Sequence, residues 1–243
     1  DEEIFKKIKI NLNIKKYLHV GSLRAWLGKK YAEEKKLITN DKNQYDICLI
    51  GKDIFYINDQ EDKNYFNEKL YTNRCLESYY ILNLHLSKFC KKYNLKICVA
   101  LKGKKKINAP AKLNAEANNY FYENIYKGNN IELVHGDIHN FSSYVTIMNS
   151  KFIISVQDTM LRESIIFKKK ILCCSYYPDI EMHEALSGKQ LLTDNSYEAF
   201  EERVLEILNM STEEFYKQIK PSPNYRMAPA NTINSIQDMV NSK

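Results

Sequence analysis

The chain has 243 residues, of which 44% are hydrophobic and 27% charged, and its formal net charge at pH 7 is +6. This is the composition of an ordinary globular protein with enough chain for a large core, and it excludes a disordered or fibrous protein. No apolar run approaches the roughly 18 residues of a membrane helix. The mildly basic balance suits anionic ligands, although compositional drift explains most of the scattered lysines equally well.

Strand-like and helix-like patterns alternate along the first half of the chain. Short apolar runs bounded by glycine or polar residues predict four strands, at 17–20, 45–50, 95–101 and 131–135. Apolar residues at helical spacing predict helices at 74–93 and 113–126. Asn94 and Gly128 follow these helices and are typical helix stops.

The second half of the chain continues the alternation. Residues 142–148 form a predicted short helix, and 151–174 is a strand, a polar triplet, a helix from Met160 to about Lys168, and a strand over 171–174. Two capped helices are predicted after it. Asn195 with Glu198 caps the first, and Ser211 with Glu214 forms a capping box for the second. A last helix is predicted at 230–240.

Strands that alternate with helices through short loops predict an α/β fold, a Rossmann-like parallel sheet of five or six strands with helices on both faces. The strands are continuous apolar runs, as expected where both faces of a sheet are buried. Residues 1–44 are less regular, and we interpret them as a hinge, or the remnant of a preceding domain, with a first strand. Residues 45–243 form the main domain. The first residue is Asp rather than Met, so a fragment or a processed product is expected.

The six cysteines indicate a reducing compartment. None forms a C-x-x-C pair, and four of them lie inside predicted strands, where a thiol acts as a small hydrophobe. This pattern predicts free thiols in the cytoplasm rather than a disulfide scaffold. We expect no metal site.

Polar and glycine residues follow several predicted strands, and in one parallel sheet these positions meet at a single edge, where such sheets bind ligands. The candidate binding residues are Ser22, Arg24, Lys102, His135, Gly136, Gln157, Asp158, Thr159 and Glu163. Asp137 and His139 are weaker candidates. No side chain is assigned a catalytic role.

Each candidate has a functional and a structural interpretation. Thr159 opens a helix, where its hydroxyl and N–H suit a phosphate, or it only caps the helix. Asp158 caps the helix or meets sugar hydroxyls. Glu163 accepts ribose hydroxyls or is a solvated charge paired with lysine. The Arg24 guanidinium suits a bidentate carboxylate or phosphate. His135 contacts a nucleobase or pyrophosphate, or is a satisfied core histidine.

Missing motifs narrow the function. The chain has no G-x-G-x-x-G, no G-x-x-x-x-G-K-[ST] and no G-x-S-x-G, which argues against a dinucleotide fingerprint, a P-loop ATPase and a hydrolase elbow. The aromatic residues do not alternate with arginine as in a single-strand binding groove, so no nucleic-acid partner is expected.

The order of these segments resembles a known family. HVGSLR is followed by YDICLIGK, YNLKICVALKG, IELVHGD, SKFIISVQDTMLRESIIFKKKIL and LLTDNSYEAFEERVLEIL. Over roughly residues 15–240 the chain resembles the C-terminal, donor-binding half of GT-B glycosyltransferases. It is most similar to bacterial proteins of surface-carbohydrate biosynthesis, such as capsule and lipopolysaccharide assembly. Kinship extends to glycerophosphotransferases and nonhydrolysing sugar-nucleotide epimerases.

The resemblance implies a metal-independent glycosyltransferase that needs no cofactor. Residues 153–167 would hold the donor's phosphates, Glu163 would meet the ribose, and His135-Gly136 would lie near the nucleotide. The donor would be a CMP-, UDP-, GDP- or CDP-linked sugar. The absence of glycine from Gln157-Asp158-Thr159 departs from the family's phosphate loop and favours a monophosphate donor such as a CMP-sugar.

The resemblance also implies partners and a location. The acceptor would be a glycan, and the catalytic base would come from an N-terminal acceptor-binding domain or a partner chain. The protein would be cytoplasmic, at most peripheral at the inner face of the membrane. Two alternatives remain open: a nonhydrolysing sugar-nucleotide epimerase, for which the sequence offers no convincing set of acid/base carboxylates, and a noncatalytic nucleotide-binding or interaction module.

Overall fold

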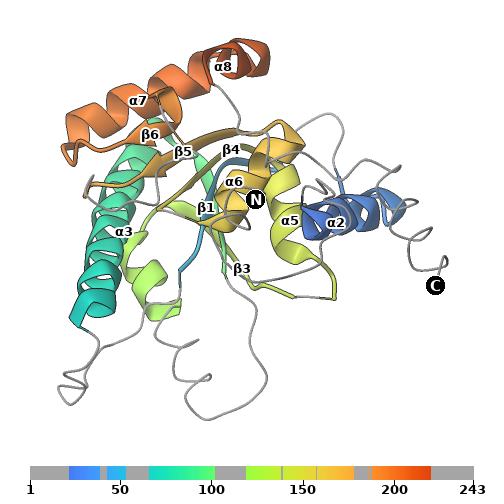
Figure 1. Cartoon of the computed structure of the whole chain (residues 1–243), viewed down its shortest axis with the longest axis horizontal. Coiled ribbons are helices and arrows are strands. Elements are labelled where there is room, and N and C mark those ends of the chain that lie inside the picture. The colour runs from blue at the N-terminus through green and yellow to red at the C-terminus, as the bar shows by residue number, and fades with distance from the viewer. Residues whose placement is uncertain are drawn as a thin grey trace, which may run out of the picture.

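A computed structural model describes residues 22–38, 43–52, 66–101, 119–137, 139–156, 158–177, 186 and 188–219, with side chains in the segment 66–101 described from Arg74 onward. Six parallel strands form one sheet in the order β3-β2-β1-β4-β5-β6 (Figure 1). The strands are β1 (Tyr45–Ile50), β2 (Lys96–Ala100), β3 (Asn130–Val134), β4 (Ser150–Ser155), β5 (Lys170–Cys174) and β6 (Leu191–Leu192).

This strand order is that of a Rossmann-type sheet. The chain builds outward from β1 to β3 and then returns to place β4 on the other side of β1. Cys48 of β1 is therefore paired with Cys98 of β2 on one side and with Ile153 of β4 on the other. The segment that joins β3 to β4 is the connection at which the strand order reverses.

Helices cover both faces of the sheet (Figure 1). They are α2 (Leu23–Glu34), α3 (Phe66–Tyr93), α5 (Ser142–Met148), α6 (Thr159–Glu163), η1 (Ser164–Phe167), η3 (Gly188–Gln190), α7 (Tyr197–Asn209) and α8 (Thr212–Gln218). Helices α3 and α7 lie on one side of the sheet and α5 and α6 on the other, and residues 119–125 are also helical. Helix α2 lies outside this layer, beside α5.

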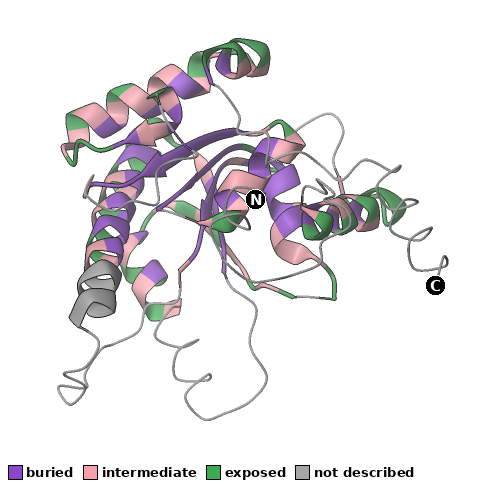
Figure 2. Ribbon diagram, in the orientation of Figure 1, coloured by how far each residue is buried: buried purple, intermediate pink, exposed green. Residues whose placement is uncertain are grey.

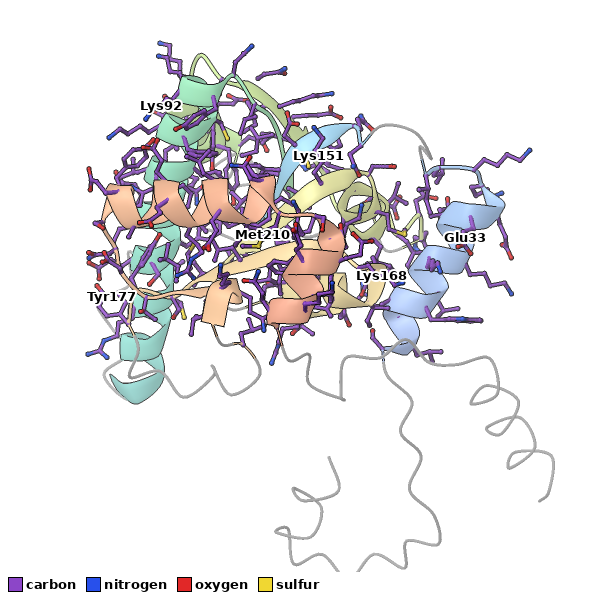
Figure 3. All side chains as sticks on the ribbon, turned by 90° about the horizontal axis from the view of Figure 1, so that it is seen from above. Glu33, Lys92, Lys151, Lys168, Tyr177 and Met210 are labelled. Carbon is purple, nitrogen blue, oxygen red and sulfur yellow. The ribbon has the colours of Figure 1, made fainter. Side chains whose placement is uncertain are left out.

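The core is formed by the central strands and the helix faces that contact them. Ile47, Ile97, Ile153 and Leu172 are fully buried, each on a different strand, and Figure 2 shows the buried residues concentrated in the sheet. Figure 3 shows α7 crossing beside α3, where the labelled Lys92 pairs with Glu201 at 2.9 Å. Burial on both faces explains why these strands are continuous apolar runs.

The predicted fold class is confirmed, and most predicted elements lie within a residue or two of the observed ones. The capping box at Ser211 and Glu214 is present, and Asn94 has the left-handed conformation expected of a helix stop. The described cysteines are free and buried. The predicted strand at 17–20 and the helix at 230–240 lie outside the described residues, and the domain division at residue 44 stays a prediction.

Three predicted details are wrong. The helix predicted at 74–93 is α3, which begins eight residues earlier, at Phe66. The helix predicted from Met160 to Lys168 is α6 followed by the 3-10 turn η1, because Ser164 Oγ donates back to Met160 O at 2.7 Å and Lys168 closes the turn with a left-handed φ of 54°. Ser196, not Asn195, caps α7. Its side chain accepts from Ala199 N, while the Asn195 carbonyl lies 2.8 Å from the His85 ring.

Among the described residues, no helix is long and apolar enough to span a membrane. The same residues contain no group of three or more His, Cys, Asp or Glu side chains arranged to hold a metal ion.

Candidate functional site

A small pocket lies against the connection that reverses the strand order. Its volume is about 50 Å³, and five of its residues come from the β3–α5–β4 connection. The lining residues are Arg24, Gly136, Asp137, Phe141, Ser143, Tyr144 and Met160. Ligands of doubly wound sheets bind outside the carboxyl ends of the strands at this reversal, so this is the candidate site.

Arg24 enters the pocket from α2, whose position is fixed by its packing on α5. Ala25, Gly28 and Ala32 form the buried face of α2. A Cβ built on Gly28 would lie 2.9 Å from Tyr144 Cγ, so the two helices approach closely only because residue 28 has no side chain. Arg24 itself is exposed. Its guanidinium has no hydrogen bond or ion pair to any residue that the structure describes.

Glu163 joins three helices beneath the pocket. Its Oε1 accepts a hydrogen bond of 2.7 Å from Ser22 Oγ, at the start of α2, and its Oε2 accepts one of 2.7 Å from the Tyr144 hydroxyl on α5. Burial, together with the Glu163 carboxylate, raises the pKa of Tyr144 well above its ordinary value. Tyr144 is therefore a neutral donor at physiological pH, and among the described residues Glu163 pairs with two hydroxyl groups rather than with a lysine.

Asp137 is an ionised carboxylate on the pocket wall. Its Oδ1 accepts from His139 N at 2.8 Å and its Oδ2 from Asn140 Nδ2 at 2.6 Å. The His139 N–H, followed by the donors of Asn140, holds the pKa of Asp137 below its ordinary value. The loop is fixed further because Asp137 N donates to Ser142 Oγ at 2.7 Å. The pocket lining thus contains a fixed negative charge as well as the positive charge of Arg24.

Phe141 forms an apolar wall in an unusual backbone conformation. It precedes α5 with φ 47° and ψ 32°, in the left-handed region that bulky residues rarely adopt. Its ring lies 5.6 Å from that of Tyr31 and 6.4 Å from that of Tyr144, centroid to centroid. The surrounding packing therefore holds a strained residue at the edge of the pocket.

The structure brings several of the predicted residues together. Arg24 and Gly136 line the pocket, and Ser22 and Glu163 are hydrogen-bonded beside it. His135 is exposed rather than a core histidine, and its carbonyl accepts from Ser142 Oγ at 3.0 Å.

The loop after β4 is described in part. Asp158 caps α6 by accepting from Met160 N at 2.8 Å, which confirms the capping interpretation. Thr159 is exposed at the first position of α6. Lys102 and Gln157 lie outside the described residues.

Sequence reasoning missed Tyr144, Ser143, Phe141 and Met160 as site residues. In the sequence, Tyr144 occupies an apolar position on a short predicted helix. Its hydrogen-bond partner Glu163 is 19 residues away, so no local pattern connects the two. The only local signal is Gly28, a glycine inside a helix, which marks a place of close approach.

A second pocket of about 310 Å³ lies between α3 and residues 119–125. Its described lining is Leu76, Glu77, Tyr79, Tyr80 and Phe121. It is formed on the opposite face of the sheet from the Arg24 pocket, and Glu77 is the only charged residue in this lining. It therefore lacks the cation that an anionic ligand needs.

Comparison with known proteins supports the fold. No family model and no curated protein gives a match to this sequence. Among solved structures, a putative UDP-N-acetylglucosamine 2-epimerase from Listeria monocytogenes aligns with 100% of this chain at a TM-score of 0.52 and 12% identity. A UDP-GlcNAc 2-epimerase from Neisseria meningitidis bound to UDP-GlcNAc aligns with 88% at a TM-score of 0.47 and 13% identity.

The Listeria protein shares the Rossmann-like fold of this chain. The chain spans 57% of the Listeria protein and 48% of the Neisseria protein, so it corresponds to about half of each. The resemblance to glycosyltransferases stays a prediction.

Proposed function

We propose that this chain binds a nucleotide sugar at the carboxyl edge of its sheet, with a phosphate held by Arg24. The observation that carries the proposal is the Arg24 pocket. An exposed guanidinium without a partner among the described residues faces the connection at which the strand order reverses. A guanidinium offers two parallel N–H donors to phosphate oxygens, and its charge persists at every physiological pH.

Thr159 extends the proposed phosphate site. It precedes Met160, which lines the pocket, and it is exposed, with no hydrogen bond from its hydroxyl to another residue that the structure describes. The Thr159 hydroxyl would donate to a phosphate oxygen. The volume of about 50 Å³ suits one phosphate-sized group rather than a whole nucleotide. The nucleoside and the sugar would therefore extend along the sheet edge, outside the pocket.

We propose epimerisation of the nucleotide sugar as the first reaction to test. The supporting observation is the shared fold with a putative UDP-N-acetylglucosamine 2-epimerase over the whole chain. Sugar transfer, as the donor-binding half of a metal-independent glycosyltransferase, is the second candidate. Sugar transfer is favoured because epimerisation needs several acid/base groups, whereas the described pocket lining contains a single carboxylate, Asp137.

Thermal unfolding with UDP-N-acetylglucosamine, and with CMP-, GDP- and CDP-linked sugars, tests the binding proposal. A ligand at one hundred times its Kd stabilises the folded state by about 2.7 kcal/mol. We expect one nucleotide class to raise the Tm of the wild type and to have little effect on Arg24→Ala. No shift with any of them contradicts the proposal.

The reaction is identified from its products. Proton NMR of a nucleotide sugar incubated without an acceptor reveals an epimer. Release of free nucleotide that depends on a glycan acceptor indicates transfer. The noncatalytic alternative predicts binding with neither product.

A further inference from the structure

Two carboxylates at the Arg24 pocket, Asp137 and Glu163, differ in their exposure. Asp137 lines the pocket and is exposed, whereas Glu163 is half-buried and is absent from the pocket wall. A ligand whose phosphate meets Arg24 therefore lies beside the Asp137 carboxylate before it reaches Glu163.

Asp137 is built to accept hydrogen bonds from a ligand. Its oxygens accept hydrogen bonds from His139 N and Asn140 Nδ2, and the carboxylate keeps further accepting capacity on its exposed side. Its charge is secured because the same donors hold its pKa below the ordinary value. An ionised carboxylate at this place attracts hydroxyl groups and repels a second anion.

Glu163 has a different environment. Each of its carboxylate oxygens is hydrogen-bonded to a hydroxyl group of the protein, one from Ser22 and one from Tyr144. Ser22 is the N-cap of the helix that carries Arg24, since Ser22 Oγ also accepts from Ala25 N at 3.1 Å. Glu163 is therefore connected to Arg24 through the first turn of α2.

We infer that the two carboxylates have different tasks. In the hydroxyl task, Asp137 accepts hydrogen bonds from hydroxyl groups next to the bound phosphate. In the positioning task, Glu163 is a positioning residue that fixes Arg24 and Tyr144. The hydroxyl task rests on the proposed function. It narrows the substrate to a phosphate ester whose neighbouring sugar carries free hydroxyls. A sugar with a carboxylate or a second phosphate at that point is disfavoured by like-charge repulsion.

The test compares the affinities of wild type and variants for two probes, UDP-N-acetylglucosamine and inorganic pyrophosphate, by calorimetry. Asp137→Asn keeps the size of the side chain and removes its charge. We expect it to weaken binding of the nucleotide sugar by about tenfold, the effect of a lost charge-assisted hydrogen bond, and to leave pyrophosphate binding equal or tighter. Equal weakening of both probes, or of neither, overturns the hydroxyl role.

Asp194→Asn is the matched control for Asp137→Asn. Asp194 is also an exposed aspartate whose Oδ1 accepts a backbone N–H, from Ser196 at 2.8 Å, and its pKa is lowered by the same kind of contact. It is absent from the described pocket lining. We expect this variant to bind both probes as the wild type does. A loss equal to that of Asp137→Asn would overturn the inference.

Glu163→Gln tests the positioning task. We expect it to weaken pyrophosphate and nucleotide sugar by the same factor, because Arg24 serves both. Tyr144→Phe, which removes a single hydroxyl, is the second variant if Glu163→Gln does not fold, and the same proportional loss is expected. Pyrophosphate binding that survives in the folded variants overturns this task. A wild type that binds pyrophosphate but no nucleotide sugar overturns the proposed function and the hydroxyl task, and leaves the positioning task to be judged on pyrophosphate alone.

Discussion

Ser22 and Glu163 lie 141 positions apart in the chain, and their side chains meet in a hydrogen bond of 2.7 Å. The same Ser22 oxygen accepts Ala25 N at 3.1 Å and so caps α2. One hydroxyl thus caps the N-terminus of α2 and joins this helix to α6. The position of Arg24 therefore depends on both hydrogen bonds of the Ser22 hydroxyl.

Ser22→Ala removes the cap and the contact with Glu163 together. Loss of a serine cap costs about 1 kcal/mol, and a hydrogen bond to a charged group contributes about 1.5–3 kcal/mol. We expect the free energy of unfolding in urea to fall by more than 1.5 kcal/mol, on the order of these two losses combined.

Ser211→Ala is the control for the cap alone. Ser211 Oγ accepts Glu214 N at 3.1 Å at the start of α8, within a local capping box. Its loss is expected to cost about 1 kcal/mol. If the two variants lose the same stability, the contact between Ser22 and Glu163 contributes nothing.

Lys168→Gly is expected to stabilise the protein. Lys168, labelled in Figure 3, ends η1 with φ 54°, in the left-handed region that costs a residue with a side chain about 1–2 kcal/mol. Glycine removes that cost but increases the entropy of the unfolded chain, so we expect a net gain of about 0.5–1 kcal/mol. Urea unfolding measures it.

Asn94→Gly is the comparison for Lys168→Gly. Asn94 ends α3 with φ 50°, and asparagine tolerates this conformation better than lysine does. We expect a smaller gain. A loss of stability in Lys168→Gly would show that its side chain contributes more than the backbone strain costs.

The sequence was sufficient for the fold because the signals are local. The strand over Tyr45–Ile50 and the helix over Ser142–Met148 have the predicted bounds, since each has its own apolar pattern and polar flanks. The site was predicted in part. Arg24 and Gly136 were found because they follow predicted strands. Tyr144 was missed because its hydroxyl acquires a role only when α6 brings Glu163 within 2.7 Å.

The importance of Asp137 could not be predicted from the sequence either. In the sequence it was only a weaker candidate. Its importance comes from contacts with His139 and Asn140 and from the pocket that it lines opposite Arg24. These facts depend on the tertiary arrangement and have no counterpart in spacing or composition.

Lys169 is expected to make stability depend on pH between 8 and about 10.4, its unfolded value. Burial lowers the pKa of Lys169 to about 8, and its Nζ lies 3.3 Å from Asn43 Oδ1. In this window the unfolded chain binds the lysine proton and the folded chain does not. The Lys169 contribution to the free energy of unfolding therefore rises with pH.

Lys169→Met isolates this contribution, because other groups act in the opposite direction. Burial raises the pKa of thiols such as Cys90, to about 12, so the folded state retains protons that the unfolded state loses. We predict that the stability difference, variant minus wild type, decreases as pH rises from 8 to 10 in urea titrations. A difference that is constant over this range contradicts the pKa of about 8.

Gly28→Ala tests the packing that positions Arg24. Alanine favours a helix over glycine by about 1 kcal/mol, but here its Cβ would lie 2.9 Å from Tyr144 Cγ and 3.0 Å from Tyr144 Cβ. Overpacking costs about 1–3 kcal/mol, so α2 must shift away from α5. We expect a net loss of stability of about 1 kcal/mol and weaker binding of pyrophosphate.

Leu27→Ala is the control on the neighbouring position of α2, where the side chain is 40% exposed and absent from the packing against Tyr144. It is expected to leave pyrophosphate affinity unchanged. Gain of stability in Gly28→Ala with unchanged affinity would mean that α2 has room beside α5. In that case the position of Arg24 would depend on Glu163 and Ser22 rather than on the close contact of the two helices.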